Sequence, residues 1–155
     1  MNAHESDQVE PFVYDNASYH YDGDWPEGLE KKQAYVHTGF YIGWIITRNL
    51  HSRSFAEHHA SEIDAFKRRQ MTGPEVYEKI GGLFTSDMLS EEGHAFTEAY
   101  FHLKKGWYLK DYGHLLADVH PTAYHVEDTW NNYERMATRI DQQYDYWLNH
   151  SSEGA

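Results

Sequence analysis

The clearest pattern along this chain is a stripe of apolar positions in its last quarter that steps by four and three residues in alternation. The stripe comprises Val126, Trp130, Tyr133, Ala137, Ile140, Tyr144 and Trp147. This spacing places the side chains on one face of a helix, opposite the polar residues. It predicts a long amphipathic helix that begins near Asp128, followed by a flexible tail over residues 151–155.

The segment from Glu30 to Leu50 is apolar on nearly every side. Helical spacing relates Val36, Phe40, Trp44 and Thr47, while isoleucines and a tyrosine fill the other faces. Such a segment predicts a central helix, although the β-branched content of residues 36–46 leaves a buried strand as an alternative. Gly39 and Gly43 lie four residues apart and are expected to permit close approach of another backbone.

Capping motifs mark the starts of two further helices. Ser54-Phe55-Ala56-Glu57 and Thr72-Gly73-Pro74-Glu75 each contain the hydroxyl and the glutamate that satisfy backbone amides at a helix start. The first helix is expected to run to about Gln70. The second has a proline in its first turn and is expected to end at Gly81-Gly82.

Another helix is expected to begin between Thr85 and Ser90. One of its faces would carry Phe96, Tyr100, Leu103 and Trp107, and Lys104-Lys105-Gly106 would close it with the cations that a helix C-terminus favours. Together these elements predict a mainly α fold. We expect a single-domain helical bundle of four to five helices over residues 13–150.

The stretch Phe12–Trp25 does not fit this helical pattern. It contains five aromatic residues and three aspartates in fourteen positions. Disordered segments are poor in aromatics, so we expect an irregular aromatic N-terminal segment whose rings lie on the helices. Asp15, Asp22 and Asp24 are expected to stay in solvent or to cap backbone amides. Residues 1–12 are expected to form a flexible tail.

The chain contains no cysteine, which excludes disulfides and thiolate metal sites. Residues 1–10 have no lysine, no arginine and no apolar run, so no secretory leader is expected. The longest apolar stretch, over residues 40–46, is too short to span a bilayer. We therefore expect a cytoplasmic protein without a membrane partner.

Charge is distributed unevenly within a formal net charge of −12. Residues 1–30 carry a charge of −8, residues 31–110 carry +2, and residues 111–155 carry −6. The two acidic ends of the chain repel nucleic acid and anionic lipid, because proteins that bind these ligands need a basic surface. A cationic protein is the natural counterpart, since electrostatic attraction raises its rate of association. A requirement for solubility alone would also explain the acidity.

Catalytic motifs are sparse. The chain has no thiol nucleophile and no serine in G-x-S-x-G, and Gly81-Gly82 lacks the downstream lysine of a phosphate loop. Glu91 and His94 form one E-x-x-H pair, whereas a di-iron site needs a second pair on another helix. The twelve histidines are otherwise scattered. The sequence therefore predicts no catalytic residue, no bound metal and no cofactor.

Tyrosine is unusually abundant, with thirteen residues in a chain of 155. Interfaces favour tyrosine because it offers a large contact area at a low cost in conformational entropy. The alternative is that each ring packs on the protein's own helices with its hydroxyl hydrogen-bonded. An acidic and aromatic surface is the functional feature that these residues predict.

Four blocks of sequence carry a resemblance. They are Y-D-N-A-S-Y-H-Y-D-G-D-W-P at 14–26, L-S-E-E-G-H-A-F at 89–96, Y-L-K-D-Y at 108–112 and Y-H-V-E-D-T-W-N-N-Y at 124–133. They resemble a bacterial family of uncharacterised small proteins, in which tryptophan is commoner at Tyr19 and asparagine at His94. The resemblance implies no catalytic residues. It implies a likeness to the small acidic partners encoded beside bacterial polymorphic toxins.

These observations lead to the hypothesis of an immunity protein that binds and neutralises a cognate toxin, expected to be cationic, without turnover. The candidate contacts are acidic or aromatic residues, namely Asp15, Tyr19, Asp22, Asp24, Trp25, Glu91 and Glu92. Two alternatives stay open. One is a small metal-dependent enzyme that uses dispersed histidines and glutamates, and the other is a regulatory adaptor without catalytic activity.

Overall fold

The computed structural model describes residues 10–102 and 104–151, and these are mainly helical. They form eight α-helices and two strands, with short 3-10 and π segments between them. In chain order the elements are β1 Val13–Asn16, α1 Ala17–Tyr21, η2 Lys31–Tyr35, α2 Val36–Thr47, α3 Arg53–His58, α4 Ala60–Lys67, α5 Gly73–Lys79, β2 Leu83–Thr85, η3 Ser86–Met88, α6 Glu91–Tyr100, α7 Tyr108–Tyr112, η4 Gly113–Ala117, η5 Ala123–His125 and α8 Trp130–Ser151. The prediction of a mainly α fold is confirmed, whereas a bundle of four to five helices is not.

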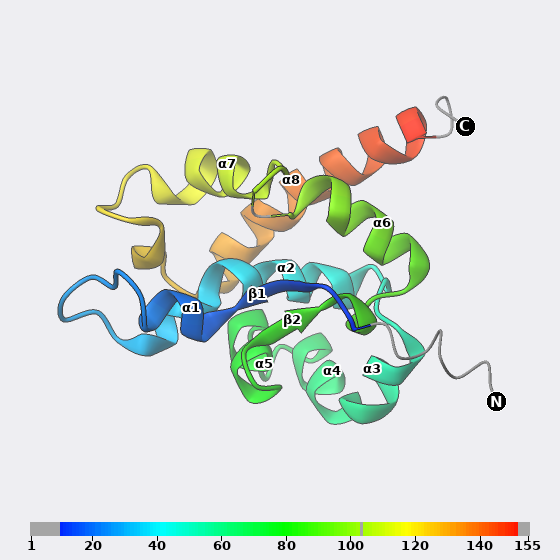
Figure 1. Ribbon diagram of the computed structural model, residues 1–155, viewed down its shortest axis with the longest axis horizontal. Coiled ribbons are helices and arrows are strands. Elements are labelled where there is room, and N and C mark those ends of the chain that lie inside the picture. Colours follow the sequence, from blue (N-terminus) through cyan, green and yellow to red (C-terminus); the bar gives the residue numbers. More distant parts are fainter. Residues whose placement is uncertain (1–9, 103, 152–155) are drawn as a thin grey trace.

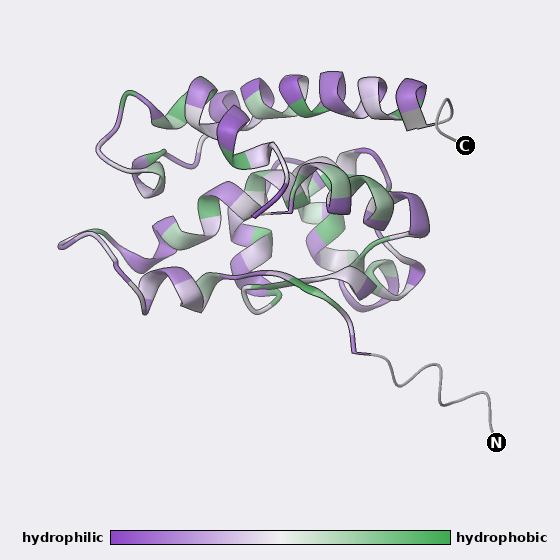
Figure 2. Cartoon of the chain, turned by 45° about the horizontal axis from the view of Figure 1, so that its top comes forward, coloured by the Kyte–Doolittle hydropathy of each residue, from purple (hydrophilic) through white to green (hydrophobic). Residues whose placement is uncertain are grey.

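Helix α2 lies at the centre of the molecule, with α3, α4 and α5 on one side and α6, α7 and α8 on the other (Figure 1). Every residue from Val36 to Ile46 is buried. The hydrophobic positions concentrate on the helices in the middle of the molecule, while α8 is largely hydrophilic along its outer surface (Figure 2). A helix that is apolar all round needs neighbours on several sides. The strand alternative for residues 36–46 is therefore wrong.

Helices α2 and α5 approach each other as closely as two backbones can. A Cβ atom added at Gly39 would lie 2.3 Å from the Cα atom of Pro74, and one added at Gly73 would lie 2.2 Å from the carbonyl oxygen of Gly39. No residue larger than glycine fits at either position without moving a helix. The prediction of close backbone approach is confirmed for Gly39, whereas a Cβ atom added at Gly43 would meet the aromatic rings of Phe66 at 2.8 Å and Tyr133 at 3.1 Å.

The predicted capping box at Thr72 is also confirmed. Its hydroxyl accepts a hydrogen bond from the Glu75 amide at 3.2 Å, while the Glu75 carboxylate accepts one from the Thr72 amide at 2.8 Å. Pro74 occupies the first turn of α5. Gly81 and Gly82 follow the helix with positive φ angles of 110° and 70°, which favour glycine. This short helix is therefore fixed at both ends by its own sequence.

The predicted capping box at Ser54 is wrong. Ser52 is the N-cap, because its hydroxyl accepts from the Phe55 amide at 3.0 Å. The backbone leaves the helical region at His59, where φ is −129° and ψ is 34°, so α3 and α4 are separate helices. The second of them ends at Lys67, before the expected end at Gln70.

Helix α6 begins at the N-cap Ser90, within the expected interval, but it ends at Tyr100. Trp107 therefore does not continue its apolar face, and the indole is 56% exposed. Helix α7 and the π segment η4 follow, and neither was predicted. Position 103, which was assigned to the same face, lies outside the described residues.

The long C-terminal helix α8 begins at Trp130, close to the predicted start. Its first turn is capped by Thr129, whose hydroxyl accepts from the Asn132 amide at 3.1 Å. Val126, the first residue of the predicted stripe, lies before the helix and is fully buried. The expected flexible tail includes Ser151, which is the last residue of the helix, while positions 152–155 lie outside the described residues.

The expectation of an irregular N-terminal segment is wrong for residues 13–21, which form helix α1 and one strand of a small antiparallel sheet that was not predicted. Strand β1 pairs with β2, and Val13 lies opposite Thr85. Phe12 exchanges hydrogen bonds with Ser86, so the expectation of a flexible tail as far as position 12 is wrong. The part of that tail at positions 1–9 lies outside the described residues. Among the described residues no helix has the length and apolar character that a bilayer crossing requires.

Candidate functional site

Asp15 in β1 is the most densely hydrogen-bonded side chain near the N-terminus, and it is 3% exposed. Its Oδ2 atom accepts hydrogen bonds from the hydroxyls of Thr38 at 2.7 Å and Tyr77 at 3.1 Å. Its Oδ1 atom lies 2.7 Å from Nε2 of His20. The expectation that Asp15 stays in solvent is wrong, because this carboxylate joins β1 and α1 to the central helices α2 and α5.

The surroundings of Asp15 keep its carboxyl group ionised. Burial by itself would raise the pKa of Asp15, but the hydrogen bond from His20, the charges of the two histidines and the hydrogen bond from Thr38 together outweigh burial and lower it. His37 lies beside the same carboxylate, with its Nε2 atom 3.8 Å from Oδ2. Burial lowers the pKa of His37 to about 4, so its imidazole is neutral at pH 7.

His20 extends the network toward Tyr124, whose hydroxyl lies 2.7 Å from Nδ1. Carboxylate, imidazole and phenol thus form one hydrogen-bonded chain. Burial, with the charge of Asp15, raises the pKa of Tyr124, so this phenol remains protonated. A protonated phenol is a hydrogen-bond donor or a proton source and not a nucleophile.

Asp15, His20 and His37 together form a candidate metal-ligand set. One ligand atom from each residue lies within 4.8 Å of the other two, and within the described parts of the chain this is the one group of three or more such residues that could hold an ion. The predicted E-x-x-H pair has a different role, because Nδ1 of His94 lies 2.8 Å from the Tyr14 hydroxyl. The contact fixes a buried ring.

The other predicted contacts in the N-terminal segment lie at the surface. Tyr19 is 68% exposed, and Asp22 and Asp24 are exposed. Trp25 is half-buried, with its ring centroid 4.7 Å from that of Tyr124. Its indole N–H donates to the carbonyl of Leu29 at 2.8 Å. Trp25 therefore has a structural role in closing the loop between α1 and η2.

Glu91 and Glu92 are exposed in the first turn of α6. The carboxylate of Glu92 accepts a hydrogen bond from the hydroxyl of Tyr144 in α8. The structure thus distributes the seven predicted contacts among a buried network, an exposed loop and a separate helix. It does not bring them together into one patch.

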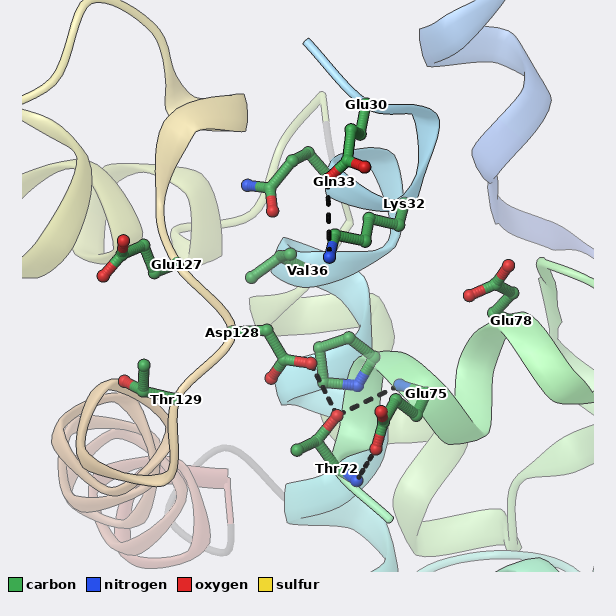
Figure 3. A pocket seen from close by; sticks show the side chains of 11 residues that line it. Glu30, Lys32, Gln33, Val36, Thr72, Glu75, Glu78, Glu127, Asp128 and Thr129 are labelled. Carbon is green, nitrogen blue, oxygen red and sulfur yellow. Dashed lines mark hydrogen bonds and ion pairs between the residues drawn. The ribbon is translucent and has the colours of Figure 1, made fainter.

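An acidic groove, which was not predicted, lies between the start of η2, helix α5 and the segment before α8 (Figure 3). Its volume is about 560 Å³. Five carboxylates and one amine contribute to its lining, which comprises Glu30, Lys32, Gln33, Val36, Thr72, Pro74, Glu75, Glu78, Glu127, Asp128 and Thr129. Glu127 and Asp128 come from one side and Glu75 and Glu78 from the other. The groove is therefore a concave surface of negative charge.

Asp128 is the most constrained carboxylate of the acidic groove. Its Oδ2 atom accepts a hydrogen bond from the Thr72 hydroxyl at 2.6 Å. Its Oδ1 atom is buried and has no hydrogen-bond partner within the described structure. Burial, with the charge of Glu75, raises the pKa of Asp128. A cation in the groove would stabilise the ionised form of this carboxyl group.

The acidic groove adjoins the exposed N-terminal loop. Glu30 ends the loop that contains Asp22 and Asp24, and it forms an exposed ion pair with Lys32 at 3.4 Å. The amide nitrogen of Gln33 donates to the carbonyls of Tyr124 and Val126 at 2.8 and 2.9 Å, which ties the segment before α8 to η2. The sequence contained one signal for the groove, since Glu75, Glu127 and Asp128 all lie at helix starts.

Comparison with known proteins places the chain in a family. Residues 13–126 match the domain of unknown function DUF7832. The match covers well over half of the chain, so the chain belongs to this family. It includes the Asp15 network and most of the residues lining the acidic groove, and it ends before α8. Comparisons with curated proteins and with solved structures gave no match.

Proposed function

We propose that this chain is an immunity protein that binds a cognate bacterial toxin and neutralises it without turnover. The acidic groove carries the proposal. The groove is lined by five carboxylates and only one lysine, so its electrostatic field attracts cations and repels anionic ligands. A groove of about 560 Å³ has room for one or two long side chains of a partner protein.

Lysine or arginine side chains of the toxin are the groups that fit this groove. The Oδ1 atom of Asp128 is buried and lacks a partner in the described structure, and a guanidinium group would supply one if this side chain turned toward the groove. Binding would thus combine charge neutralisation with the satisfaction of a buried acceptor.

The exposed loop gives the proposed interface its rim. Asp22 and Asp24 precede Glu30 on that loop and are exposed. Rim charges change the rate of association and its salt dependence more than the lifetime of the complex. Tyr19 is a candidate aromatic contact because most of its ring is exposed. Trp25 and Asp15 would support this surface from within.

The direct test is to purify the chain with its partner from the source cell, to identify the partner, and to express that partner with and without this chain. The proposal expects a partner that arrests growth and is neutralised by the chain. A partner that is harmless when expressed alone would favour the regulatory adaptor instead.

A paired set of variants locates the interface. Glu78→Gln with Glu127→Gln removes two charges from the acidic groove, while Glu91→Gln with Glu92→Gln removes two from α6. We expect the groove variant to slow association at least fivefold and to weaken its salt dependence, with little change for the α6 variant. The opposite result would move the interface to α6.

The metal-dependent enzyme remains a second candidate function. One specific observation favours it, namely the convergence of Asp15, His20 and His37. Conversion of many substrate molecules by each metal-loaded chain would be needed to support this function over toxin binding.

A further inference from the structure

Two adjacent elements near the N-terminus and the central helix bring three metal-ligating side chains to one point. Asp15 lies in β1, His20 in α1 and His37 in α2. The Nε2 atom of His20 is 2.7 Å from Oδ1 of Asp15, and the Nε2 atom of His37 is 3.8 Å from Oδ2. Two imidazoles and one carboxylate form a ligand set that suits Zn²⁺, Fe²⁺ and related divalent transition metals.

The spacing of these atoms is close to what an ion requires. Ligand atoms that bind one ion at about 2.1 Å in tetrahedral geometry lie roughly 3.4 Å from one another. The longest separation among the three ligand atoms is within 4.8 Å, and the shortest is 2.7 Å. Small rotations of the two imidazoles would bring all three within reach of a common ion.

The groups around the three ligands match an outer shell of a metal site. The hydroxyls of Thr38 and Tyr77 both donate to Oδ2 of Asp15, which orients the carboxylate. The Tyr124 hydroxyl bonds Nδ1 of His20, so the other ring nitrogen is directed at Asp15. Such partners fix ligand orientation in metal sites and raise affinity.

Without an ion, the ligand atoms of His20 and Asp15 hydrogen-bond to each other, because the Nε2–H group of His20 can donate to the Asp15 carboxylate. A metal would replace that proton on Nε2. The proton can move to Nδ1 of the same ring, where the Tyr124 oxygen accepts it, or it can leave to solvent. A phenol suits this exchange because it both donates and accepts.

The side chains of Asp15 and His37 are buried, and His20, whose side chain is 17% exposed, is the ligand nearest to solvent. A second groove, with a volume of about 430 Å³, has Asp15 and His20 among its lining residues. Tyr19, which is mostly exposed, lies at the same groove. An ion that enters by this groove would meet His20 first, and local movement of the surrounding side chains would admit it to Asp15 and His37.

We propose that Asp15, His20 and His37 bind one divalent transition-metal ion. The site is independent of the proposed toxin binding, since the metal ligands and the lining of the acidic groove share no residue. Failure of either proposal leaves the other standing, because one is measured with metal ions alone and the other with a partner protein.

The test uses the full chain without a histidine tag, stripped with EDTA and titrated with Zn²⁺ and with Co²⁺. We expect one equivalent to bind, visible d–d absorption with Co²⁺, and a raised Tm. His20→Gln is expected to lower the affinity at least tenfold. The matched control is His114→Gln, because His114 lies 3.8 Å from Asp118 in an exposed His–Asp pair and should not affect binding.

Long-range ¹H–¹⁵N spectra of the wild-type imidazoles keep the proposal testable if the His20 variant does not fold. Zn²⁺ is expected to shift the ring nitrogens of His20 and His37. The proposal is overturned if no stoichiometric ion binds, if His20→Gln binds as tightly as the wild type, or if the shifts are confined to other histidines.

Discussion

Replacing Gly39 by alanine tests whether the contact between α2 and α5 holds the acidic groove in place. The new methyl carbon would lie 2.3 Å from Cα and 2.5 Å from N of Pro74. Carbon atoms pack at about 3.5–4.0 Å, so α5 would have to retreat by roughly 1 Å. Both atoms belong to backbone and cannot rotate away, which places the cost at the upper end of overpacking, about 3 kcal/mol.

This cost should be measurable in two ways. For a domain of this size it corresponds to a fall in Tm of roughly 6–12 °C, and urea unfolding followed by tryptophan fluorescence gives the free energy directly. Thr72, Glu75 and Glu78 move with α5, so Gly39→Ala should also weaken binding of a cationic partner to the acidic groove.

Gly113→Ala is the matched control. Gly113 has a helical φ of −59°, and the nearest heavy atom to its added Cβ is the Asp118 carboxylate oxygen at 3.4 Å. Alanine there should stabilise the protein by up to about 1 kcal/mol. Equal effects of the two substitutions, or a Gly39→Ala protein as stable as the wild type, would refute the close-approach argument.

Two further predictions concern buried carboxylates. Asp15→Asn, measured in EDTA, should lower the free energy of unfolding by about 3 kcal/mol, because an amide group cannot accept from His20, Thr38 and Tyr77 together; the exposed control Asp22→Asn should stay within about 0.5 kcal/mol of the wild type. Burial raises the pKa of Asp128, so the folded protein binds this proton more tightly than the unfolded chain does, and the associated stability is present at low pH and lost as the pH rises through the raised pKa. As the pH falls from 7 toward 4, the free energy of unfolding of the wild type should therefore rise relative to that of the Asp128→Asn variant. A difference in free energy between the two proteins that does not change with pH would contradict this prediction.

Local signals in the sequence were sufficient for much of the helical framework. The stripe of α8, the capping box at Thr72 and the all-round apolar character of α2 each depend on residues a few positions apart. The errors at Ser54 and Trp107 are also local. In the first case Ser52 caps the helix two residues earlier, through the Phe55 amide, and in the second the helix ends about two turns before the apolar pattern does.

Long-range pairing explains what the sequence could not reveal. The partner of β1 lies about seventy residues further along the chain, and both strands are short. Asp15, Asp22 and Asp24 look alike in sequence, and only contacts from α2 and α5 show which of them is buried. The acidic groove likewise combines residues from three separate segments, each unremarkable by itself.

The position of β1 has a consequence for synthesis in the cell. Strand β1 is synthesised well before the side chain of Tyr77 and the backbone of Thr85 that hold it. Until then the aromatic rings of this segment have no completed site to occupy. The nascent chain must therefore carry an unattached, ring-rich segment until Thr85 has been synthesised.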